Sequence, residues 1–160
     1  MSARISAFEL EVLKSAFETI ADELAIIVMR TSCSSIVRDA IDYSTAICDA
    51  AGRTLAQGLT NPGHLGSFFD AMRHVLRQYE GSLHPGDVFI GNDPYIGALH
   101  QNDVQMVAPI FSGGEIVAWA GVEAHETDVG GMDFASWSPD RKSTRLNSSH
   151  SQQSRMPSSA

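Results

Sequence analysis

The chain has 160 residues, 43% of them hydrophobic and 19% charged, a composition that suits one globular core rather than two. Its formal net charge is -8, from 19 acidic and 11 basic residues. Because phosphate backbones and anionic lipid surfaces attract basic proteins, this balance argues against nucleic acid and membrane partners.

The cysteine content and the apolar runs indicate the compartment. Cys33 and Cys48 are too few for a disulfide framework, which favours a reducing environment. The apolar stretch Leu24–Met29 is short and follows acidic residues, unlike a signal peptide or a membrane span. We therefore expect a cytoplasmic protein.

Residues 7–30 are predicted to form a long amphipathic helix. Ser6 and Glu9 have the spacing of a capping box, which satisfies the first backbone N–H groups of a helix. Apolar residues then recur with a period near 3.6, at Leu10, Leu13, Phe17, Ile20, Leu24, Ile27 and Val28.

A β-hairpin and a second helix are predicted to follow. Tyr43–Cys48 and Thr54–Gln57 are strand-like, and Gly52 lies between them where a positive φ is expected. The second helix ends at Gly81, and His64 is interpreted as a cap at its start. Its apolar face consists of Phe68, Met72, Val75 and Tyr79.

A short strand, Val88–Ile90, precedes a second predicted hairpin made of Val104–Ile110 and Glu115–Val122. If its turn centres near Gly113, residue numbers across the hairpin sum to about 226. His125 then lies near Gln101. The predicted fold class is mixed α/β (α+β), with a long N-terminal helix, antiparallel hairpins and a second helix, as a partial domain of a larger chain.

This hairpin brings His100, Asp103 and His125 to one end. Two imidazoles and one carboxylate suit a divalent metal with open coordination positions, whereas solvated histidines at a sheet edge are the alternative interpretation. Positions i and i+3 of a strand point to opposite faces, so His100 is expected in the preceding loop. This spacing also disfavours a cupin-type oxygenase, whose H-x-D ligands share one face.

Two acidic residues follow the third proposed ligand. Glu126 is a candidate general base, and Asp128 is a candidate to orient a ligand or to serve as a fourth one. Solvated loop residues are the alternative for both. The sequence contains no phosphate-binding glycine loop of the Walker or dinucleotide type, so any ATP-dependent step is expected on another polypeptide.

The segment 140–160 differs from the rest, because it contains seven serines and no helical or strand periodicity. Its beginning, DRKSTRLNSSH, matches the translation of a common sequencing adapter. We therefore interpret residues 140–160 as a disordered tail that is an assembly artefact, and residues 1–139 as the N-terminal part of a domain.

Four sequence runs, taken in this order, resemble the hydantoinase B family. They are DYSTAICDAAGRTLAQG (42–58), HLGS (64–67), PGDVFIGNDPYIGALHQNDV (85–104) and AHETDVGG (124–131). Together with the first helix they cover essentially all of residues 8–139. This resemblance includes 5-oxoprolinases and the α-type subunits of acetone and acetophenone carboxylases.

The resemblance implies a reaction whose steps are divided between two subunits. An ATP-using, hydantoinase A-like partner phosphorylates a carbonyl or amide oxygen, and the B-type subunit completes hydrolysis or carboxylation in a hetero-oligomer. By motif, the manganese site of the acetone carboxylase branch maps onto His100, Asp103 and His125. Manganese and zinc are the expected metals.

Three functions follow as hypotheses. The first is a subunit of an ATP-dependent hydrolase that opens a cyclic amide, such as a hydantoin or 5-oxoproline. The second is the α-type subunit of a ketone carboxylase, and the third is a non-catalytic, partner-binding subunit with a structural metal.

Overall fold

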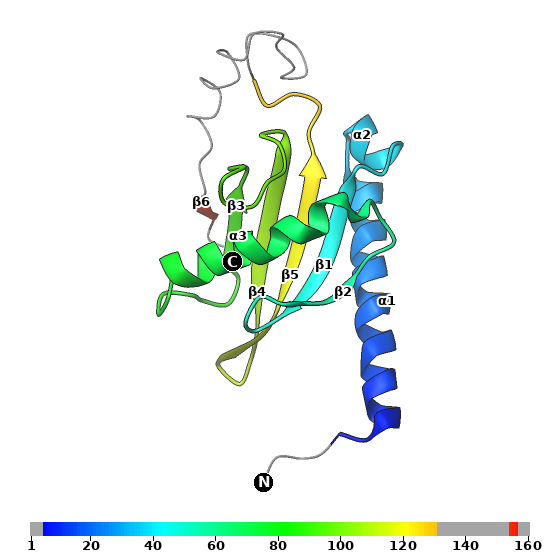
Figure 1. The fold of residues 1–160 in the computed structure, drawn as a ribbon, viewed down its shortest axis with the longest axis vertical. Helices are drawn as coiled ribbons and strands as arrows, with labels where there is room; N and C mark the ends of the chain where they lie inside the picture. Colours follow the sequence, from blue (N-terminus) through cyan, green and yellow to red (C-terminus); the bar gives the residue numbers. More distant parts are fainter. Residues whose placement is uncertain (1–4, 131–153, 157–160) are drawn as a thin grey trace.

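A computed structural model describes residues 5–130 and 154–156 and contains a six-stranded sheet flanked by helices (Figure 1). The sheet order is β2-β1-β5-β4-β3-β6, and every neighbouring pair is antiparallel. The strands are β1 (Tyr43–Asp49), β2 (Thr54–Gln57), β3 (Val88–Gly91), β4 (Asp103–Ser112), β5 (Glu115–His125) and β6 (Ser154–Met156). The helical elements are α1 (Ala7–Thr31), α2 (Ser35–Arg38), the 3-10 turn η1 (Pro62–His64) and α3 (Leu65–Gln78). The predicted α+β class is confirmed.

Helix α1 begins as predicted and ends one residue later than expected. The Ser6 side chain accepts a hydrogen bond from the Glu9 backbone N–H, and the Glu9 carboxylate accepts one from the Ser6 N–H. Both halves of the capping box are therefore present.

The buried face of α1 is narrower than the apolar periodicity predicts. Ala21 and Ala25 are its buried residues, at 0% and 4% exposure. Several larger apolar residues of the predicted stripe are instead exposed, namely Leu10, Leu13, Ile20 and Ile27. The helix therefore packs on the sheet through small side chains.

Polar contacts between α1 and the sheet explain why alanines are its buried residues. Tyr43 donates a hydrogen bond from its hydroxyl to the Ala25 carbonyl at 2.8 Å, and Thr45 donates one to the Ala21 carbonyl at 3.1 Å. A Cβ added to Gly58 would lie 2.7 Å from that same Ala21 oxygen. The helix backbone therefore lies too close to the sheet for leucine or isoleucine at these positions.

Strand β1 is buried from Tyr43 to Cys48 because helices cover both faces of the sheet. Alternate side chains point to opposite faces, so Ile47 packs with Ala21 of α1. Ala46 and Cys48 face α3, which crosses the other face of the sheet in Figure 1. Neither this two-sided burial nor the pairing of β1 with β5 follows from the local sequence pattern.

The main core lies between α3 and the sheet. Three fully buried residues of α3 contribute to it, namely Phe68, Met72 and Val75. Tyr79, just past the end of the helix, is partly buried against them. They pack against Phe89 of β3, Val107 of β4 and Trp119 of β5. The predicted apolar face of the second helix is thus confirmed.

The β4–β5 hairpin has a register different from the predicted sum of 226. The turn consists of Gly113 and Gly114, both at positive φ, so Ser112 pairs with Glu115. An irregularity after Ile110 adds a further residue on β5, and Asp103 therefore lies directly opposite His125. The predicted partner, Gln101, lies outside the ladder.

The predicted disordered segment 140–160 lies largely outside the described residues. Within it, β6 pairs with β3 and forms one edge of the sheet. No helix in the described part of the chain is long and apolar enough to cross a lipid bilayer.

Candidate metal centre

Asp103 is the centre of the predicted ligand group. Its side chain is fully buried, and it begins β4 opposite His125, the last residue of β5. One carboxylate oxygen lies 2.6 Å from the Nδ1 atom of His125, and the other lies 3.0 Å from the Nδ1 atom of His100. The three predicted ligands therefore meet.

His100 reaches Asp103 from a folded loop, as the spacing argument predicted. The Asp103 carboxylate accepts a hydrogen bond from the His100 backbone N–H at 2.6 Å. The Asp93 carbonyl accepts from three successive N–H groups farther back in the loop, and Asn92 donates to the Gln101 carbonyl. These contacts hold the loop against the start of β4.

The arrangement fits a divalent metal. Side-chain ligand atoms of His100, Asp103 and His125 all lie within 4.8 Å of one another. Two ligands bound at about 2.1 Å and at right angles are about 3.0 Å apart, close to the two carboxylate–imidazole distances observed. His100 is 60% exposed at its side chain and His125 only 16%, so an ion held here would be open on the His100 side.

Gly97 fixes the loop against α3. A Cβ at this position would lie 2.9 Å from the Ser67 carbonyl oxygen and 3.0 Å from the Ala71 backbone nitrogen. Gly97→Ala is expected to lower the free energy of unfolding by about 1–3 kcal/mol, because helix backbone cannot move aside easily. It should also weaken metal binding, since His100 lies on the same loop.

Urea denaturation and metal titration measure these two effects. Gly66→Ala is the matched control, because a Cβ there meets nothing within 4 Å and the residue is helical. Its stability should be unchanged or slightly higher. Equal behaviour of the two variants would contradict the packing role of Gly97.

His64 lies in the same cluster and was missed by the sequence analysis, which interpreted it as a helix cap. It does occupy the N-cap position of α3, but its side chain makes no capping hydrogen bond. The ring is instead buried at 4% exposure, with Nε2 3.9 Å from one oxygen of Asp103 and of Asp42. Only the tertiary fold places it there.

Glu123 is the second missed residue. It lies on β5 two residues before His125, so strand alternation puts both on the face covered by α3. Its carboxylate is fully buried and accepts a hydrogen bond from Gln105 at 2.7 Å, and it contacts the Ser67 hydroxyl. Burial raises the pKa of Glu123 to about 7, although the hydrogen bonds from Ser67 and Gln105 oppose this shift. The sequence signal that could have identified Glu123 is a single carboxylate within an otherwise apolar stretch of strand.

Glu126 and Asp128 lie beyond the end of β5. The backbone of Glu126 exchanges hydrogen bonds with Asn102, which ties the strand end to the start of β4. Asp128 is exposed, and its carboxylate accepts from the Gly130 N–H in a local turn. The cluster formed by His100, Asp103 and His125 does not include either residue, and their catalytic roles remain predictions.

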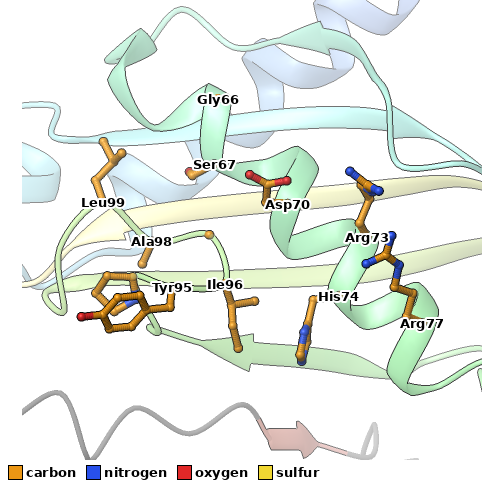
Figure 2. Close-up of a pocket in the computed structure, with 12 residues that line it drawn as sticks. Gly66, Ser67, Asp70, Arg73, His74, Arg77, Tyr95, Ile96, Ala98 and Leu99 are labelled. Carbon is orange, nitrogen blue, oxygen red and sulfur yellow. The ribbon is translucent and has the colours of Figure 1, made fainter.

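A pocket of about 590 Å³ extends to Leu99, the residue before His100, and none of the three proposed ligands lines it (Figure 2). It lies between α3 and the loop that leads to His100, and Ser67 belongs both to its wall and to the surroundings of Glu123. Along α3 the pocket is lined by one acidic residue, Asp70, and by the basic residues Arg73, His74 and Arg77, and the facing loop contributes Tyr95. The pocket thus combines basic groups with a position beside the proposed ligands.

A family model described as hydantoinase B/oxoprolinase matches residues 6–147, and the chain belongs to this family. Caprolactamase subunit beta of Pseudomonas jessenii is 36% identical over 138 residues, which are 86% of this chain and 24% of that protein. The 5-oxoprolinase of Saccharomyces cerevisiae is 34% identical over 134 residues, covering 83% of this chain and 10% of the relative.

Solved structures agree with the sequence relatives. The crystal structure of ATP-dependent caprolactamase from Pseudomonas jessenii has a TM-score of 0.73 at 32% identity, covering 85% of this chain and 24% of that one. Nucleotide-free acetone carboxylase has a TM-score of 0.71 at 25% identity, covering 76% and 16%. The chain therefore spans about a quarter or less of the proteins it resembles.

Proposed function

We propose that this chain carries the metal-binding part of a subunit of an ATP-dependent cyclic-amide hydrolase. The observation that carries the proposal is the buried Asp103 carboxylate, which contacts the Nδ1 atoms of both His100 and His125. Relatives named 5-oxoprolinase and caprolactamase support a cyclic amide as the substrate class.

A divalent ion, manganese or zinc, would be held by His100, Asp103 and His125. Such an ion supplies Lewis acidity to a carbonyl oxygen or lowers the pKa of a bound water. The protein's own contribution is to fix the two imidazoles on one carboxylate and to leave the His100 side accessible. Glu126 and Asp128 are proposed to accept a proton from the attacking water and to orient it.

The ATP-dependent step is proposed to take place on a partner subunit. The name of the caprolactamase relative, subunit beta, supports a complex of several subunits. A hydantoinase A-like subunit would phosphorylate the amide oxygen, and the product would then enter the pocket between α3 and the His100 loop. Arg73, His74 and Arg77 line this pocket and favour an anionic phosphoryl group.

The test combines the purified protein with its candidate ATP-using partner and scores ATP-dependent ring opening of 5-oxoproline, hydantoin and caprolactam. His125→Ala is expected to lower turnover at least about 100-fold, because it removes a ligand. His84→Ala is the matched control, since that ring is 68% exposed at its side chain and lies outside the cluster. Absence of turnover on every amide, or full activity of His125→Ala after chelation, would contradict the proposal.

A ketone carboxylase is the second candidate, favoured by the structural match to acetone carboxylase. There the same residues would hold the metal, and its positive charge would stabilise an enolate formed from a phosphorylated ketone. Bicarbonate-dependent consumption of a ketone with ATP, without opening of any cyclic amide, would establish this reaction in place of hydrolysis.

A further inference from the structure

An inner group of donors lies beside the three proposed ligands. It consists of His64, Asp103 and Glu123, whose ligand atoms all lie within 4.8 Å of one another. All three side chains are buried, at 4%, 0% and 0% exposure. The group differs from the outer one in being enclosed by α3 and the sheet.

The tautomer of His64 follows from its neighbours. Ser44 has a single hydroxyl proton, which it donates to the Asn61 carbonyl. The His64 Nδ1 atom lies 3.3 Å from that hydroxyl oxygen, which is therefore left as an acceptor. Nδ1 of His64 must then carry the hydrogen, and a neutral ring presents a lone pair at Nε2.

That lone pair faces negative charge. Nε2 of His64 lies 3.9 Å from one oxygen of Asp103 and 3.9 Å from one oxygen of Asp42. These distances are too long for hydrogen bonds and leave room for a bridging group. A positive group between Nε2 and these carboxylate oxygens, either a metal ion or a proton on Nε2, would be attracted by both carboxylates.

Glu123 provides a separate indication. One of its carboxylate oxygens accepts the hydrogen bond from Gln105, whereas the other, Oε1, is buried and makes no well-aligned hydrogen bond to the described residues, the backbone N–H of Leu99 being the further donor near this carboxylate. An unpartnered buried carboxylate oxygen is costly, and coordination to a cation is one of the few ways to satisfy it.

We propose that His64, Asp103 and Glu123 bind a second divalent transition-metal ion, with Asp103 shared between the two sites. This proposal rests on the metal centre proposed above, because both ions use Asp103. Two carboxylates and one imidazole match the donors of manganese or zinc. Ligands bound at about 2.1 Å are about 3.0 Å apart at right angles and about 4.2 Å apart on opposite sides of an ion, so donor atoms spread over as much as 4.8 Å would need to move closer together when the ion binds.

The enclosure of the inner donors defines what this ion would do. His64 and Glu123 offer no exposed coordination position for a substrate. The inner ion would therefore compensate the buried charge of Asp103 and Glu123 and hold the shared carboxylate in place. Substrate would meet only the outer position beside His100.

The test uses Mn²⁺ alone as the probe and is carried out on the purified full-length protein. After chelation, reloading and desalting, bound manganese is measured by elemental analysis. The wild type is expected to hold about two ions per chain, and Glu123→Gln and His64→Ala about one each. Electron paramagnetic resonance should show coupled ions in the wild type and an isolated six-line Mn²⁺ signal in Glu123→Gln.

Matched controls come from the same elements of the chain. Glu115→Gln changes an exposed glutamate of β5, and His84→Ala removes an exposed histidine, so both should keep two ions. Circular dichroism on every variant shows whether the fold is retained, and the wild-type resonance signal tests the proposal even if a variant fails to fold.

The possible outcomes separate the two metal proposals. One ion per wild-type chain with an isolated signal would overturn the inner site and keep the outer one, and a bound water or proton would then occupy the inner position. No retained ion at all would overturn both. Loss of both ions in a folded Glu123→Gln protein would show that the inner residues form no separate site.

Discussion

Asp103→Asn is expected to reduce the affinity for Mn²⁺ by more than about 100-fold, because removing even an outer-shell partner of a metal site commonly costs 10–100-fold. The asparagine keeps the size of the side chain but removes the charge that contacts His100 and His125. Every proposed ion in the chain uses this carboxylate. Loss of metal should therefore be accompanied by loss of ATP-dependent turnover.

Thermal unfolding with and without Mn²⁺ measures this effect independently of activity. At about 100 times the dissociation constant, an ion stabilises the wild type by about 2.7 kcal/mol, and the variant should show almost none of this gain. Asp39→Asn is the control, since it alters an exposed ion pair with Arg38. Equal metal-induced stabilisation of Asp103→Asn and wild type would refute the ligand assignment.

Trp119→Ala is expected to lower the free energy of unfolding by about 3–5 kcal/mol. The indole is fully buried between α3 and the sheet, with its ring centre 6.4 Å from that of Phe89. Its removal leaves a cavity in the core that supports both the β4–β5 hairpin and α3. The metal site should be lost only when the protein unfolds.

Urea denaturation provides the measurement, as a lower midpoint at an unchanged slope. Trp119→Phe should cost much less than Trp119→Ala, because the indole N–H makes no hydrogen bond to any described residue and its loss carries no penalty of that kind. Val117→Ala, on the same strand but 49% exposed, should change stability by less than about 1 kcal/mol. Similar costs for Val117→Ala and Trp119→Ala would contradict this placement of the core.

Local signals in the sequence were sufficient to predict α1, α3 and the two hairpins, but not the short helix α2 or the turn η1. The capping box at Ser6, the glycine turns at Gly52 and Gly113, and the apolar face of α3 each act within a few residues, so they can be read without the fold. The apolar stripe of α1 was a poorer guide. Periodicity shows that a helix has an apolar side, but the close approach of Tyr43 and Thr45 selected the alanines for burial.

Only some of the candidate ligands could be predicted from local signals in the sequence. His100, Asp103 and His125 could be grouped because one hairpin carries two of them and a short loop the third. The predicted register was wrong by two residues, because neither the two-glycine turn nor the irregularity after Ile110 follows from strand periodicity. The three residues were still correctly predicted to lie close together, because all of them are at the open end of the hairpin, where a shift of two residues changes their separation little.

The sequence by itself thus determined the two longer helices, the two hairpins, the short strand β3, the family motifs and the three outer ligand candidates, because these depend on short-range spacing. Only the tertiary structure decided that His64, 39 residues before Asp103 in the chain, lies against Asp103, and that Glu123 faces α3 rather than solvent. The physical reason is that β1 pairs with β5 and α3 crosses the sheet, and these long-range contacts leave no local signal in the chain.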